Sequence, residues 1–159
     1  MNIRSLLLGG CMTLSFWPTG ALAKNIIIPL NNNRQIILKA GVPNNLDEIM
    51  VGSAEETFKA IINYKSEDND TNVIVDFWAS WCGPCRAMGN TLHAIAPQYP
   101  DIIILKVNTD NPEFNFLSNR FQVRSIPLLL FFKNGKLVHK QTGSLNPANC
   151  TTLIDTTFA

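Results

Sequence analysis

Cys82 and Cys85 are the residues of this chain best suited to chemistry, and Gly83-Pro84 separates them. Two intervening residues let the sulfur atoms meet in a small ring, so the pair can alternate between dithiol and disulfide without unfolding the protein. The apolar run 73–78 ends just before them, and a stretch compatible with helix follows from Arg86. We therefore expect both thiols on the first turn of a helix, at the carboxyl end of a buried strand, where they would exchange electron pairs with other thiols.

Cys82 is predicted to be the attacking thiol, because the unpaired N–H groups at the start of a helix stabilise a thiolate. The helix dipole contributes about 0.3–1 kcal/mol to that stabilisation, and stronger activation requires hydrogen bonds to the sulfur. Pro84 suits the first helical turn, where an N–H would be unpaired anyway. Cys85 is then the shielded resolving thiol.

Asp76 is the candidate base for Cys85. It lies in an apolar strand between Val75 and Phe77, which favours burial, although an acid at a strand end facing solvent is the alternative. A buried carboxyl without a full ion-pair partner has a raised pKa. Asp76 is thus predicted to accept and return a proton near neutral pH.

Alternating strand and helix patterns surround these residues and indicate an α/β fold. They predict strands at 73–78, 102–108, 128–133 and 136–142, and helices at 82–96, 112–121 and 146–158. Asn134-Gly135 is a strong signal for a tight hairpin between the last two strands. This order predicts a central mixed β-sheet flanked by helices on both faces.

The segment before residue 73 has its own signals. Two short β-like runs, 26–30 and 35–38, predict an N-terminal β-hairpin, and 41–45 has the composition of a linker. A first strand of the main domain is expected at 49–51. Ser53, with Glu56 three residues later, predicts a capping box at the start of a helix.

The amino end is predicted to be an export signal. Arg4 supplies the positive start, 6–17 the apolar stretch, and Ala21-Leu22-Ala23 the cleavage site. The stretch is shorter than the ~20 residues of a membrane-spanning helix, so we expect no permanent span. Lipid attachment at Cys11 is an alternative. The expected organisation is a signal peptide at 1–23, an extension at 24–48 and one domain at 49–159.

The net charge and the cysteine count indicate which classes of partner the protein can bind. The chain has 159 residues and a formal net charge of +1, and the leader carries Arg4 but no acidic residue, so the mature protein is neutral. A neutral protein lacks the electrostatic footprint of nucleic-acid binding or of an anionic membrane surface. The three cysteines that remain after removal of the leader are too few for a disulfide scaffold, so we expect the partners to be proteins reached through thiol chemistry.

Several motifs together resemble the thioredoxin family over residues 49–159: Val-Asp-Phe-Trp-Ala-Ser-Trp-Cys-Gly-Pro-Cys at 75–85, Ser-Ile-Pro at 125–127, Phe-Phe-Lys-Asn-Gly at 131–135, and Gly143. The resemblance implies a thioredoxin-like fold and thiol:disulfide oxidoreductase activity without a bound cofactor. It implies that Gly83 and Pro84 tune the redox poise toward a reductant. It also implies that Lys106 lies beside Asp76 and modulates it.

The resemblance further implies a substrate surface. Ile126-Pro127 would form a cis-proline loop that faces the cysteines and offers backbone hydrogen bonds, with Gly143 nearby. Trp81 is expected to form an apolar rim, whereas Trp78 is expected to serve packing. The sequence departs from the family where a kinking proline usually follows the cysteines, since that position is Asn90.

The expected function is that of an exported, periplasmic and monomeric reductase or exchanger of protein disulfides, fed by a membrane thiol-reducing donor. An oxidase that donates its disulfide is one alternative, and a binding module that does not need the cysteines is another.

The remaining cysteine and histidines carry weaker hypotheses. A zinc site using Cys82 and Cys85 lacks a second close pair of ligands, and a Cys-His hydrolase would need His93 nearer to Cys82 than the same helix allows. His139 adds no motif. Cys150 falls at an inward-facing position of the last helix, which predicts a buried inert thiol, with a second redox thiol or an intermolecular disulfide as the alternatives.

Overall fold

The computed structural model describes residues 25–30, 33–65 and 70–159. The expected signal peptide and part of the first hairpin turn lie outside these residues. The strands are β1 Asn25–Pro29, β2 Gln35–Lys39, β3 Pro43–Asn45, β4 Asn72–Trp78, β5 Ile102–Asn108, β6 Leu128–Lys133 and β7 Lys136–Thr142. The helices are α1 Leu46–Ile49, α2 Ala54–Ile62, α3 Gly83–Ile95, α4 Asn115–Arg120 and α5 Pro147–Phe158, with 3-10 turns at Ala96–Gln98 and Pro112–Phe114.

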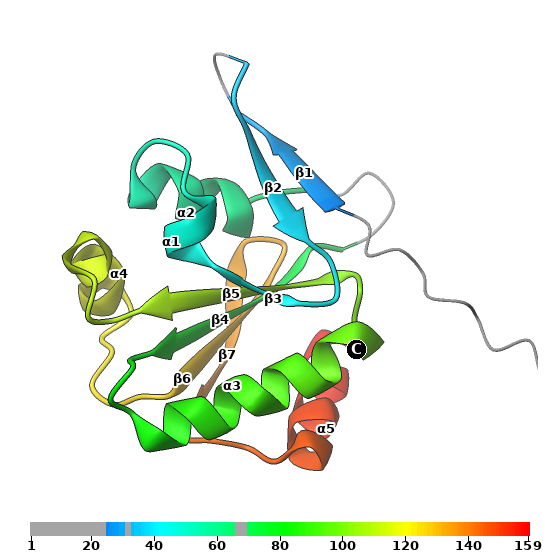
Figure 1. Cartoon of the computed structure of the whole chain (residues 1–159). Helices are drawn as coiled ribbons and strands as arrows, with labels where there is room; N and C mark the ends of the chain where they lie inside the picture. Colours follow the sequence, from blue (N-terminus) through cyan, green and yellow to red (C-terminus); the bar gives the residue numbers. More distant parts are fainter. Residues whose placement is uncertain (1–24, 31–32, 66–69) are drawn as a thin grey trace, which may run out of the picture.

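The central sheet has five strands in the order β3-β5-β4-β6-β7 (Figure 1). β3, β5 and β4 run parallel, whereas β6 is antiparallel to β4 and β7 is antiparallel to β6. Helices cover both faces, with α3 and α5 together on one of them (Figure 1). The predicted mixed sheet with helices on both faces is confirmed.

β4 divides the core because successive side chains of a strand point to opposite faces. Val73, Val75 and Phe77 enter a cluster with residues of α2 and α4. Ile74 instead packs with Met88 and other residues of α3 and α5. Asp76 follows the alternation of Ile74 and therefore faces the α3 side of the sheet.

The N-terminal hairpin is confirmed, because β1 and β2 pair antiparallel from Asn25↔Lys39 to Pro29↔Gln35. One face of it, with Ile28, Ile36 and Leu38, joins the same hydrophobic cluster as α2. The other face leaves Ile27 and Ile37 exposed. The hairpin therefore packs onto the domain as part of its core.

The strand expected at 49–51 is wrong, because Ile49 ends the short helix α1. The edge strand of the sheet is β3 instead, inside the stretch expected to be a linker. The side chain of Asn44 explains why a stretch with linker composition forms a strand. Its buried amide accepts a hydrogen bond from the N–H of Lys39 and donates to the C=O groups of Lys39 and Val42. A residue typical of turns thus satisfies the polar backbone groups beside the strand.

Local sequence signals predicted the ends of most other helices and strands to within one or two residues of the observed ends. The Ser53–Glu56 capping box is present at α2, and the turn residues Asn134 and Gly135 both have positive φ, as a two-residue hairpin turn requires. The helix expected at 112–121 is divided into a 3-10 turn and α4. α3 runs without a break past Asn90. Within the described residues, no helix has both the length and the apolarity that crossing a membrane requires.

Candidate active site

Cys82 and Cys85 form a disulfide at the start of α3. Cys82 is the N-cap residue, and its Sγ accepts a hydrogen bond from the backbone N–H of Cys85 at 3.1 Å. Cys82 is 5% exposed and Cys85 2% exposed. The sulfur of Cys82 therefore lies where a helix terminus offers an N–H donor to an anion.

The turn between β4 and α3 sets this position. β4 ends at Trp78, and the N–H of Cys82 donates to the C=O of Ala79 at 3.2 Å, which closes a tight turn. Pro84 then occupies the first helical turn, as expected from its missing N–H. A strand, a short turn and a helix start thus place both sulfurs at the carboxyl edge of the sheet.

The loop before β6 faces the cysteines. The Ile126–Pro127 peptide bond is cis, as the resemblance to the thioredoxin family implied. The carbonyl oxygen of Ile126 lies 3.8 Å from Cys82 Sγ, and Ile126 packs against the two cysteines. Gly143, at φ +89°, donates its N–H to the C=O of Pro127 at 2.9 Å. Gly143 is therefore attached to this loop through Pro127.

Trp81 is 70% exposed beside the disulfide. Its Nε1–H donates to Asp110 Oδ1 at 2.9 Å, which orients the indole. The sequence interpretation missed Asp110. A signal existed, because Asp110 follows β5 as Trp81 follows β4, and the carboxyl ends of parallel strands meet at one edge of a sheet.

Asp76 is fully buried, and neither of its carboxylate oxygens accepts a hydrogen bond from the residues that the structure describes. Burial raises the pKa of Asp76 to about 7, and the positive charge of Lys106 opposes that rise. Lys106 is the cross-strand neighbour of Asp76 in β5. The carboxyl group can therefore exchange a proton near neutral pH, which is the property that a buried acid–base residue needs.

Lys106 lies close to a residue that we expected only to pack. Its Nζ is 4.5 Å from the ring centroid of Trp78, a cation–π geometry. Trp78 also packs against the cluster formed by Cys82, Cys85 and Ala79. Trp78 thus joins the cysteine site to Lys106.

The other cysteine and the histidines lie apart from this arrangement. Cys150 is fully buried and free, and burial, together with the negative charge of Asp76, raises its pKa to about 11. His93 is exposed on α3, whereas His139 packs on the ring of Phe131. Among residues 25–30, 33–65 and 70–159, no group of three or more potential ligands could hold a metal ion.

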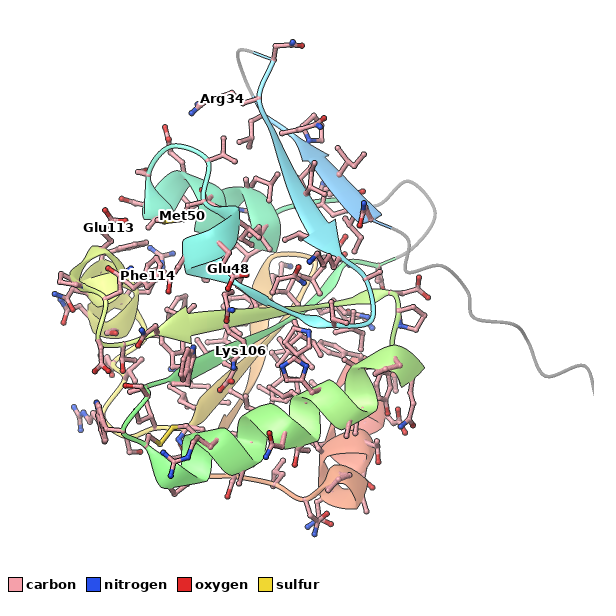
Figure 2. The ribbon with its side chains drawn as sticks, viewed as in Figure 1. Arg34, Glu48, Met50, Lys106, Glu113 and Phe114 are labelled. Atoms are coloured by element: carbon pink, nitrogen blue, oxygen red, sulfur yellow. A yellow bond between two sulfur atoms is a disulfide. The ribbon has the colours of Figure 1, made fainter. Side chains whose placement is uncertain are left out.

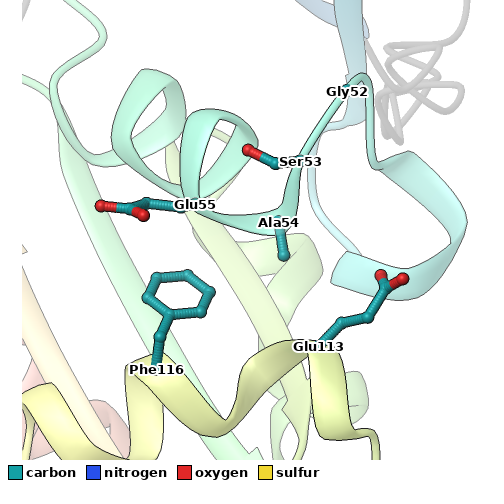
Figure 3. Close-up of a pocket in the computed structure, with 6 residues that line it drawn as sticks. All are labelled: Gly52, Ser53, Ala54, Glu55, Glu113 and Phe116. Atoms are coloured by element: carbon teal, nitrogen blue, oxygen red, sulfur yellow. The ribbon is translucent and has the colours of Figure 1, made fainter.

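A pocket lies elsewhere, where the start of α2 faces the segment before and within α4 (Figure 3). Its lining residues are Gly52, Ser53, Ala54, Glu55, Glu113 and Phe116. None of them belongs to the cysteine site, and Glu55 is already paired with Lys59 at 2.6 Å. The disulfide region therefore remains the candidate active site.

Comparison with known proteins agrees with this geometry. The thioredoxin family model matches residues 49–156. Chloroplastic thioredoxin Y of Oryza sativa is 30% identical over 139 residues, covering 83% of this chain and 80% of that protein. A thioredoxin of Chlorobaculum thiosulfatiphilum is 42% identical over 87 residues, covering 52% of this chain and 78% of that protein.

Solved structures show the same likeness. The short form of spinach chloroplast thioredoxin f superposes with a TM-score of 0.61 at 26% identity, covering 76% of this chain and 96% of that one. A mutant thioredoxin from Halobacterium salinarum gives a TM-score of 0.60 at 25% identity, covering 76% and 94%. The family model, the sequence relatives and the fold agree, and the chain therefore belongs to the thioredoxin family.

Proposed function

We propose that this protein is an exported reductase of protein disulfides that acts through Cys82 and Cys85. Family membership supports the general activity, which is thiol–disulfide exchange. The observation that carries the role of Cys82 as the attacking thiol is the position of its Sγ at the start of α3, 3.1 Å from the backbone nitrogen of Cys85. That donor and the helix terminus both favour the thiolate form of Cys82 over the thiol. The proposed direction of electron flow rests on Gly83-Pro84 between the cysteines.

The reaction begins from the reduced pair. The Cys82 thiolate attacks one sulfur of a substrate disulfide, forms a mixed disulfide and releases the other substrate sulfur as a thiolate. Cys85 then loses its proton and attacks Cys82 Sγ, which breaks the mixed disulfide and frees the second substrate sulfur. Two electrons pass from the protein to the substrate, and the Cys82–Cys85 disulfide is the oxidised product.

Asp76 is the proposed acceptor of the Cys85 proton. A carboxyl group with a pKa of about 7 can take that proton and return it when the disulfide is reduced again. Because Asp76 is completely buried on the α3 side of the sheet, bulk water cannot serve as the proton acceptor instead. Gly83 and Pro84 tune the redox poise in this proposal, because they determine how the turn holds the two sulfurs.

The proposed substrate surface joins the indole of Trp81 to the loop at Ile126. Trp81 offers an exposed apolar ring held by Asp110, and an extended peptide placed against Ile126 would lie within reach of Cys82. Pro127 and Gly143 support the loop through their mutual hydrogen bond. This surface suits an extended segment of a protein substrate better than a small thiol.

Export, a monomeric state and a periplasmic location are further parts of the proposal. Export and the periplasmic location rest on the leader at 1–23, and a membrane thiol-reducing protein would supply the electrons. Cell fractionation followed by N-terminal sequencing of the mature protein tests export, and a chain that begins at Lys24 is the expected result. Retention of the leader on a cytoplasmic protein would overturn this part of the proposal.

An insulin-reduction assay with dithiothreitol tests the activity. The chain should accelerate the precipitation of insulin over the buffer rate, and Cys82→Ser should abolish the acceleration. Cys150→Ala is the matched control, because it removes a thiol outside the site, and it should retain the activity. No acceleration by the wild-type chain would refute the reductase proposal.

A further inference from the structure

The ammonium group of Lys106 has an unusual position for a lysine beside a buried carboxyl. Lys106 and Asp76 are direct neighbours across β5 and β4, and Figure 2 shows the Lys106 side chain between β5 and α3. Within the described residues, however, Lys106 forms no ion pair and Asp76 accepts no hydrogen bond. The lysine therefore acts on the carboxyl group through space, without touching it.

Two residues define where the ammonium group lies. The ring of Trp78 is 4.5 Å from Nζ, and the attraction of a cation to an indole face is strongest for tryptophan among the aromatic side chains. On the α3 side, a Cβ added to the buried Gly89 would lie 3.6 Å from the same Nζ. Gly89 thus leaves open the space next to the ammonium group.

The groups around Asp76 are few. β5 contributes Lys106, α5 contributes the neutral thiol of Cys150, and β6 places the apolar Leu129 opposite Asp76. α3 contributes Cys85 on this side of the sheet, and Cys85 does not titrate because its sulfur is part of the disulfide. Lys106 is therefore the charge whose position can change the proton affinity of Asp76.

We propose that Trp78 and Gly89 are positioning residues that hold the Lys106 ammonium group near Asp76 but out of contact with it. This inference rests on the proposed role of Asp76 as the base of the reaction. A lysine free to reach the carboxylate would form an ion pair, and a paired carboxylate is a poor proton acceptor near neutral pH. A lysine displaced toward solvent would no longer lower the pKa of Asp76, and the carboxyl group would then hold its proton too tightly to release it near neutral pH.

The two positions predict shifts in opposite directions. Trp78→Leu removes the ring, so the ammonium group can approach Asp76 and the pKa of Asp76 falls. Gly89→Leu fills the space beside Nζ, so the ammonium group moves away and the pKa rises. Each shift should reach at least about 0.5 pKa units, because moving one of two opposite charges inside the protein by an ångström or two changes their Coulomb energy by that order. Gly89→Ala is the matched control, because its Cβ would make only an ordinary contact, and it should shift little.

The experiment is an NMR titration of the Asp76 carboxyl carbon in the disulfide form of the full chain, repeated with Lys106→Met. If Trp78 and Gly89 act through Lys106, their substitutions should shift the titration only while Lys106 is present. Equal shifts in the Lys106→Met background, or no shift with Lys106 present, would overturn the proposal. If Trp78→Leu fails to fold, Trp78→Phe provides the same comparison, because a phenylalanine ring attracts a cation less strongly than an indole.

This titration requires neither a substrate nor turnover. A chain that failed to reduce insulin but showed the Lys106-dependent shifts would refute the proposed function and keep the positioning assignment. A chain that reduced insulin without those shifts would do the reverse.

Discussion

The stability of the Asp76→Asn variant relative to the wild-type protein should increase as the pH rises above about 4. The substitution keeps the size of the side chain and removes its ability to ionise. In the wild-type protein, burial raises the pKa of Asp76 from the ordinary 3.8 to about 7. The folded state therefore holds a proton that the unfolded chain has already lost.

The sign and size of the effect follow from that difference. Between about pH 4 and pH 7 the folded protein binds more protons than the unfolded chain, so its free energy of unfolding falls as the pH rises. A difference of about 3 pKa units corresponds to about 4 kcal/mol, reached above about pH 7 and absent well below pH 4. Asp76→Asn loses this pH-dependent penalty. Any cost of burying the amide is the same at every pH.

Urea unfolding of the disulfide form at a series of pH values provides the measurement, because Cys82 and Cys85 do not titrate in that form. The stability gain of Asp76→Asn over the wild type should grow by about 4 kcal/mol from about pH 4 to about pH 8. Asp101→Asn, at an exposed carboxyl group, is the matched control and should show no such growth. A gain for Asp76→Asn that stayed constant with pH would refute the account of Asp76 as a buried proton carrier.

Three further substitutions test other parts of the structure. Leu38→Ala should reduce the free energy of unfolding, measured in urea, by about 2–5 kcal/mol, because this hairpin residue is fully buried. Ile37→Ser, on the exposed face of the hairpin, should change it little, and equal effects of the two substitutions would contradict the packing of the hairpin onto the domain. Ser53→Ala should cost about 1 kcal/mol in the same assay, since it removes the capping box of α2, and an unchanged midpoint would argue against that cap. Asp110→Ala should raise the KM for insulin several-fold with little change in kcat, because the indole of Trp81 loses its hydrogen bond; a fall in kcat alone would contradict a role in substrate binding.

Sequence patterns were sufficient where local chemistry determines the structure. The strand 102–108 is rich in branched apolar residues, and Asn134-Gly135 accepts the positive φ angles of its turn, so both were predicted at their observed bounds. The burial of Asp76 followed from the apolar residues on either side of it. The cysteine motif and its place before a helix were readable for the same reason.

Features that depend on distant segments were not readable. β3 is a strand because the amide of Asn44 bonds backbone groups around it and because β5 pairs with it, and neither is visible in the composition of 43–45. The contact of Lys106 with Trp78 likewise requires β4 and β5 to be adjacent, with a glycine of α3 opposite. Periodicity reports which face of an element is apolar, but not which polar groups meet between elements.

Reversible exchange at Cys82 and Cys85 in the folded protein is the central claim. It is tested most directly by equilibrating the chain with graded ratios of reduced and oxidised dithiothreitol, alkylating the free thiols and locating the tags by mass spectrometry, with circular dichroism on the same samples. Cys82 and Cys85 should gain and lose their tags together in one two-electron transition, while the spectrum stays native and Cys150 remains untagged. Tagging of the pair only when the native spectrum is lost, or of one cysteine without the other, would contradict the account.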